Sequence, residues 1–246
     1  LLHAGEPLAL AIAGGIIAAA VAQLMVERFT YRYLKPRFGD ATEHALPLVS
    51  SLGFLIIFQN LALILWGSDP QTFAAPWSGA NLRAGGLIIS LPQMASLLAA
   101  ILFVLAIKAL LASTAVGRAL RCIAENPGAA VLMGIDVEKL VPIVFAAAGV
   151  VAGVGGILFA ISYRQVSPAI GDDIGTKAIA AMVIGGIGNV WGAIAGGILV
   201  GMVEVFSINF FNAEAVSAVV WGLLLLILCL KPTGLFGRIS VGKGKF

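Results

Sequence analysis

Long apolar runs separated by short polar loops dominate this sequence. A helix needs about 20 mostly apolar residues to cross a bilayer. Five runs approach or meet that length, and each predicts a spanning helix: residues 7–26, 46–66, 90–111, 140–161 and 216–230. The pattern therefore predicts an all-α fold, a polytopic transmembrane helical bundle.

A sixth apolar stretch, residues 178–206, is too long for one simple helix and is interrupted by small and polar residues. We predict two short segments, 178–184 and 190–206, joined by a turn. Non-helical backbone at membrane depth is tolerated only where protein or water covers it. Such a glycine-broken membrane segment points to a translocation region, and a plain kinked helix is the alternative. The residues at the break are Gly185, Gly186, Gly188 and Asn189.

The placement of lysine and arginine predicts the orientation, because positively charged loops stay in the cytoplasm. Loop 67–85 holds only Asp69 and Arg83 as charged residues, so we expect it outside. The other loops and the tail are basic, which predicts a cytoplasmic C-terminus. Their cations are Arg28, Arg32, Lys35 and Arg37 after the first span, Lys108, Arg118, Arg121 and Lys139 around the third loop, and Lys231, Arg238, Lys243 and Lys245 in the tail.

This orientation constrains the broken stretch. The chain leaves the cytoplasm near Lys139 and is back there by Lys231, so it crosses the membrane an even number of times between them. Spans 140–161 and 216–230 supply two crossings. The broken stretch must then form either two short passes or a re-entrant hairpin, and the pattern does not distinguish these two.

Composition agrees with lipid as the main solvent. Of the 246 residues, 60% are hydrophobic and 11% are charged, whereas about 25% of the residues in a soluble domain are charged. We therefore treat residues 1–246 as a single transmembrane domain. The basic residues are not interleaved with aromatic ones as in single-strand binders, so we expect no nucleic acid partner.

Motifs for catalysis and metal binding are absent from the sequence. His3 and His44 lie outside the spans, and there is no GxSxG, HExxH or P-loop pattern. Cys122 and Cys229 have no metal-ligand spacing. We predict no catalytic residue, no metal site and no cofactor bound by this chain.

Small residues recur four positions apart in two of the apolar segments. Gly149 and Gly153 lie in the fourth span, and Gly188, Gly192 and Gly196 form a run that begins at the break. This spacing lets helices approach closely. It serves packing, or it lets helices slide against each other during transport, and the sequence does not separate the two.

Polar residues lie inside the second span. Gln59 and Asn60 carry carboxamides that are costly in hydrocarbon without a partner, and Ser51 lies about two turns earlier. They either form hydrogen bonds between helices or line a polar route. We name them as candidates for the translocation pathway, together with the residues at the break.

The longest polar loop, residues 114–139, predicts a short helix at the membrane face. Asn126 is a good N-cap and Pro127 suits a first helical position. Gly134 ends such a helix after about two turns. Its small and apolar residues are available to dock on a partner, namely Ala129, Ala130, Leu132 and Met133.

Several stretches carry a family resemblance, and together they cover nearly the whole chain. The sequence resembles the permease subunits of ABC importers for branched-chain amino acids, of the high-affinity leucine/isoleucine/valine type. The matching stretches are residues 27–32, 117–119, 124–126, 129–135, 177–178, 183–193 and 231–237.

The resemblance implies a function and a set of partners. It implies transport of amino acids from a periplasmic binding protein into the cytoplasm, across the bacterial inner membrane. It also implies a second permease subunit, related or identical, and two cytoplasmic ATPases that hydrolyse the ATP. Loop 114–139 then corresponds to a cytoplasmic coupling helix, with candidate residues Gly117, Arg118, Ala119, Arg121, Glu125, Asn126, Ala129, Ala130, Gly134 and Ile135.

One departure and two alternatives accompany this resemblance. Family members begin with further hydrophobic segments and an Asn-Phe-Ala-His-Gly motif, so we expect N-terminal helices to be missing here. The alternatives are a self-sufficient secondary transporter and an ABC permease for urea or another amide. The lack of an acidic residue deep in a span argues against proton coupling.

Overall fold

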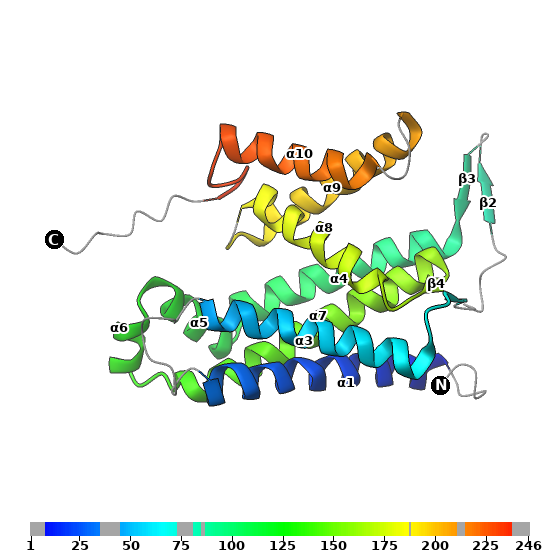
Figure 1. Ribbon diagram of the computed structural model, residues 1–246. Helices are drawn as coiled ribbons and strands as arrows, with labels where there is room; N and C mark the ends of the chain where they lie inside the picture. The colour runs from blue at the N-terminus through cyan, green and yellow to red at the C-terminus, as the bar shows by residue number, and fades with distance from the viewer. Residues whose placement is uncertain are drawn as a thin grey trace. The chain divides into compact units, whose positions relative to one another are not determined.

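The computed structural model describes residues 8–34, 45–72, 81–84, 87–186, 188–210 and 215–237. The chain forms two compact units, Leu1–Pro168 and Ala169–Phe246, each built mainly of helices (Figure 1). Among the described residues, five helices are long and apolar enough to cross a membrane, and Val216–Leu230 is a shorter apolar helix. The predicted polytopic helical fold is confirmed. The five helices are Ala9–Thr30, Val49–Trp66, Leu91–Ser113, Val137–Tyr163 and Val190–Phe210.

The first unit contains most of the described helices and four very short strands. Its elements are α1 (Leu8–Glu27), the π-helix η2 (Arg28–Leu34), α3 (Ala45–Trp66), β1 (Gln71–Thr72), β2 (Asn81–Ala84), β3 (Leu87–Ser90), α4 (Leu91–Ser113), α5 (Ala115–Glu125), α6 (Pro127–Leu132), α7 (Val137–Tyr163) and β4 (Gln165–Val166).

Helices α1 and α7 lie side by side (Figure 1) because glycine on α7 lets the two backbones approach closely. A Cβ atom on Gly149 would lie 2.7 Å from Cα of Ala20, and one on Gly153 would lie 3.0 Å from Cα of Ile16. Side chains at these positions would collide with backbone. Packing therefore accounts for this glycine pair, and the order of the contacts makes the two helices antiparallel.

The helices of the first unit alternate in direction, so the unit has two distinct ends. Strand β1 pairs antiparallel with β4, which brings together the C-terminal ends of α3 and α7. The hydroxyl oxygens of Ser96 on α4 and Ser162 on α7 are 2.9 Å apart, which brings the N-terminal end of α4 to the same side. We call this side the ribbon end. The opposite side, called the basic end, holds η2, α5, α6 and the start of α7.

The chain stays helical beyond the first predicted span, where we expected a loop. After Glu27 it continues as the π-helix η2, and Thr30 forms a 2.7 Å hydrogen bond with Ser50 of α3. Pro142 in α7 has no N–H, which leaves the carbonyl of Glu138 without its usual helical donor. Arg32 of η2 donates to that carbonyl over 3.5 Å. These contacts hold η2 against α3 and α7.

The second unit is a helical hairpin with a third helix packed against it. It consists of α8 (Ile170–Gly185), α9 (Val190–Phe210) and α10 (Ala215–Leu230), followed by a short tail. The expected break between two helices is present. Our boundaries for both were too short, because α8 begins at Ile170 and α9 continues to Phe210. The buried core consists of Ala180, Ala181, Ile184, Val200, Val216, Val220 and Leu224.

We predict that Gly149→Leu destabilises the protein, because the new side chain would collide with the backbone of α1. The expected loss is about 1–3 kcal/mol, the usual cost of overpacking, measured as a lower melting temperature of the purified full-length protein. Gly155→Leu in the same helix is the matched control, since nothing lies within 4 Å of its Cβ position. Equal melting temperatures for the two variants would contradict the packing assignment.

Candidate functional site

The connection from α4 to α5 is a sharp turn that depends on Gly117. Thr114 caps α5, and its hydroxyl accepts a hydrogen bond from the backbone N–H of Gly117 over 3.2 Å. Gly117 is buried, and a Cβ atom there would overlap the backbone of Leu111. Glycine is therefore required for the loop to fold back against the end of α4.

Two of the predicted coupling residues have a structural role at this turn. Arg118 donates to the carbonyl of Ser113 over 3.1 Å, and Arg121 donates to the carbonyl of Ala112 over 3.4 Å. These carbonyls belong to the last turn of α4, where no helical donor is available. Cations are favoured at such a helix C-terminus. Both arginines therefore stabilise the end of α4.

Helix α6 has the ends expected from the sequence. The side chain of Asn126 accepts from the backbone N–H of Ala129 over 3.1 Å, and Pro127 occupies the first turn. Gly134 has φ of +81°, a conformation that favours glycine. The N–H groups of Gly134 and Ile135 donate to the carbonyls of Val131 and Ala130 over 3.0 and 3.1 Å, which is the Schellman arrangement.

The exposed surface of this short helix is apolar. Leu132 is 90% exposed, Met133 is 76% exposed, and Val131 is also exposed. Ala130, which we expected to be available for docking, is fully buried and offers no side chain to a partner. Of the other predicted residues, Glu125, Asn126 and Ala129 are exposed, whereas Ala119 and Ile135 are half-buried.

Asp136 ends the loop and begins α7. Its carboxylate accepts from the backbone N–H of Lys139 over 3.2 Å and lies 2.8 Å from the Lys139 ammonium. The hydrogen bond from the Lys139 side chain is the main reason that the pKa of Asp136 is lowered. The lowered pKa favours the ionised carboxylate, which is the form that accepts the capping hydrogen bond.

The glycine turn of the second unit is clamped by the tail that follows α10. The backbone N–H of Leu235 donates to the carbonyl of Ile184 over 2.8 Å, and that of Phe236 donates to the carbonyl of Gly185 over 3.0 Å. Both carbonyls lie in the last turn of α8 and lack helical donors. The tail thus supplies hydrogen-bond donors to the free carbonyls at the end of α8.

Backbone geometry explains why glycine and asparagine occur at the break between α8 and α9. A Cβ atom on Gly185 would overlap the backbone of Gly192, so α8 and α9 touch there. Gly186 and Gly188 have φ of +105° and +89°. Asn189 accepts from the N–H of Trp191 over 3.0 Å and donates to the carbonyl of Phe236 over 3.1 Å. Packing and turn geometry explain these residues, and their role in a translocation pathway stays a prediction.

The other predicted pathway residues lie on α3, in the first unit. Asn60 is exposed, and its carboxamide donates to the carbonyl of Ile56 in its own helix over 2.8 Å. Gln59 is half-buried and Ser51 is exposed. These residues and the glycine turn belong to different units, each described by itself. The proposed polar route along α3 is therefore untested.

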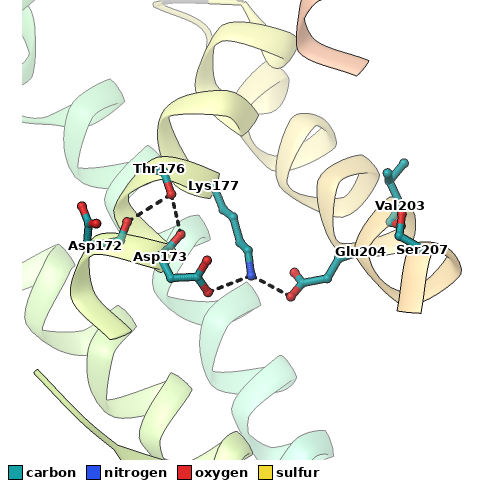
Figure 2. Close-up of polar contacts among 7 residues, drawn as sticks. All are labelled: Asp172, Asp173, Thr176, Lys177, Val203, Glu204 and Ser207. Atoms are coloured by element: carbon teal, nitrogen blue, oxygen red, sulfur yellow. Dashed lines mark hydrogen bonds and ion pairs between the residues drawn. The ribbon is translucent and has the colours of Figure 1, made fainter. Parts of the chain in front are cut away.

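A charged cluster in the second unit was missed by the sequence analysis (Figure 2). The ammonium of Lys177 on α8 lies 2.9 Å from Asp173 and 2.8 Å from Glu204 on α9. The side chains of Lys177 and Glu204 are each 23% exposed. The start of α8 at Ile170 was not anticipated, so Lys177 was not considered a helical residue. We expected no acidic residue deep in a span because the segment 178–206 placed Glu204 at its end, but α9 continues to Phe210 and contains Glu204.

We predict that Gly234→Ala loosens the clamp on the glycine turn. A Cβ atom there would lie 2.6 Å from Cα of Gly186, and Gly234 has φ of +77°. Faster hydrogen exchange of the Leu235 and Phe236 amides is the expected result. Gly222→Ala is the control, because nothing lies within 4 Å of its Cβ position. Unchanged exchange in Gly234→Ala would rule out the clamp as described.

Comparison with known proteins assigns the chain to a family of permeases. The model of the family described as "Branched-chain amino acid transport system / permease component" matches residues 1–229. The chain is similar to the permease protein BraD of the high-affinity branched-chain amino acid transport system of Pseudomonas aeruginosa. The two are 31% identical over 95% of this chain and 76% of the relative.

Two further relatives indicate how broad the similarity is. The permease protein LivH of the corresponding Escherichia coli K12 system is 30% identical over 94% of this chain and 74% of the relative. The ribose import permease RbsC of Bacillus subtilis is 26% identical over 74% of this chain and 58% of the relative. No solved structure matches. With five membrane-capable helices and a family model that covers most of its length, the chain is a multi-pass membrane protein and belongs to the branched-chain amino acid transport permease family.

Proposed function

We propose that this chain is the membrane-spanning subunit of an ATP-driven importer that moves branched-chain amino acids into the cytoplasm. The observation that carries this proposal is the similarity to BraD and LivH, which extends over 94–95% of the chain. The similarity to the ribose permease covers less of both chains at lower identity. Amino acids are therefore favoured over sugars as the substrate.

The charge distribution supports a cytoplasmic location for the basic end of the first unit. Arg28 and Arg32 lie on η2, Arg118 and Arg121 on α5, and Lys139 at the start of α7. Short loops rich in lysine and arginine stay on the cytoplasmic side. In this orientation α6 faces the cytoplasm, and the ribbon end faces the compartment from which a binding protein delivers substrate.

Helix α6 is the element that we propose to contact a cytoplasmic ATPase. Leu132 and Met133 at its C-terminal end are largely exposed. Apolar side chains on a short helix suit insertion into a groove of a partner. The arginines and Gly117 that hold α5 against α4 would keep α6 in a fixed position, so that movement of the ATPase reaches the membrane helices. A second permease, related or identical, and two ATPases complete the proposed complex.

Uptake by the full-length protein, reconstituted with its partner subunits and binding protein, tests the proposed function. Radiolabelled leucine should accumulate in proteoliposomes that contain ATP, and an inactivating substitution in the ATPase should abolish it. A protonophore should have no effect while ATP is maintained. Accumulation that survives loss of the ATPase but not the protonophore would identify a secondary transporter instead.

We predict that Leu132→Lys uncouples the complex. Because Leu132 is 90% exposed, the change should leave the fold intact and weaken docking of the ATPase. Stimulation of ATP hydrolysis by the leucine-loaded binding protein is expected to fall at least tenfold. Leu230→Lys, at a residue that is 78% exposed in the second unit, is the matched control. Normal stimulation in Leu132→Lys would exclude α6 as the docking element.

A further inference from the structure

We propose that Lys177 and Glu204, together with Asp173, bind the two charged groups of a zwitterionic amino acid during its passage. Lys177 would contact the α-carboxylate of the substrate, and the two acidic side chains would contact its α-ammonium group. This inference rests on the proposed function, because it names the contacts that an amino acid importer needs and an importer of uncharged solutes does not.

The geometry brings opposite charges together from two helices (Figure 2). Side chains of a helix point toward its N-terminus, so Lys177 reaches away from the glycine turn and Glu204 reaches toward it. They meet at 2.8 Å across the α8–α9 hairpin. Asp173, one turn before Lys177, approaches the same ammonium group to 2.9 Å. One cation thus lies between two carboxylates.

The hairpin has close backbone packing that does not involve this cluster. Cβ atoms on Gly185 and Gly196 would overlap backbone atoms of Gly192 and Ala181, respectively. An ion pair between two packed helices contributes little net stability, because removing the charges from water offsets their attraction. Glu204 lies in α9, which is long and apolar enough to cross a membrane, and an ionisable residue in such a helix is costly and is a mark of function. Helix packing alone therefore does not explain the charges.

The cluster retains hydrogen-bonding capacity for a ligand. An ammonium group has three N–H donors, and within the described part of the chain two of the Lys177 donors reach Asp173 and Glu204. The third can donate to a substrate carboxylate. Each acidic side chain has a second oxygen that can accept from a substrate ammonium. At 23% exposed, Lys177 and Glu204 remain accessible to a small molecule.

The charge balance also suits a zwitterion. The three side chains carry one positive and two negative charges, and a zwitterion adds no net charge to them. The substrate carboxylate replaces one of the two acidic side chains as a partner of Lys177. The acidic side chain that is released then pairs with the substrate ammonium group. An uncharged sugar would offer neither group. The apolar side chain of a branched-chain amino acid can then lie against the apolar surfaces of the helices.

Uptake of radiolabelled leucine and ATP hydrolysis, measured side by side in the full-length reconstituted complex, test the proposal. For Lys177→Gln and Glu204→Gln, we expect at least tenfold less leucine transported per ATP, with stimulated hydrolysis within twofold of the wild type. Lys177→Arg keeps the cation and should retain at least half of the uptake. The double variant Lys177→Glu/Glu204→Lys keeps an ion pair between the helices but exchanges its charges, and it should not restore uptake.

The outcomes separate substrate binding from a structural clamp. If the exchanged pair transports leucine within twofold of the wild type, or if uptake and hydrolysis fall together in the neutral variants, the cluster only holds the helices and the proposal is wrong. If the neutral variants do not fold, the exchanged pair alone decides the question. A wild-type complex that transports no branched-chain amino acid would overturn the proposed function, and this inference with it.

Discussion

Backbone carbonyl groups at helix ends and before a proline lack a helical donor, and in this chain side chains or backbone amides of neighbouring segments supply one. Two places in the described helices show this. At Pro142 the freed carbonyl of Glu138 receives Arg32 from a neighbouring element. At the end of α8 the carbonyls of Ile184 and Gly185 receive backbone amides from the tail. These contacts hold η2 against α7 and the tail against the end of α8.

The same kind of contact links the two candidate functional regions. The coupling loop is held to α4 by arginines that donate to its terminal carbonyls, and the glycine turn is held by the tail. Both regions are therefore fixed by polar contacts to helix ends, whereas the helices themselves pack through glycine, alanine and larger aliphatic side chains. Charged side chains within the hairpin are the exception, since Lys177 in the middle of α8 meets Glu204 in the second half of α9. A ligand role accounts for that exception.

The long spans could be predicted from the sequence because a run of apolar residues sets both helix type and length. The predicted span 46–66 corresponds to Ala45–Trp66, and the predicted cap at Asn126 is present. Three features could not be predicted. The start of α8 at Ile170 carries acidic residues, and its lysine finds a partner only after folding. The continuation of α1 into η2 depends on contacts with α3 and α7. The burial of Ala130 depends on which face of α6 turns inward.

If the basic end of the first unit lies in the cytoplasm, cysteine labelling in intact cells should reveal it. Glu125→Cys at the basic end and Asp69→Cys at the ribbon end would each be placed in full-length protein with Cys122→Ser and Cys229→Ser. A membrane-impermeant maleimide should label the cysteine at 69 in intact cells and the cysteine at 125 only after permeabilisation. Labelling at 125 but not at 69 in intact cells would reverse the orientation and contradict the account.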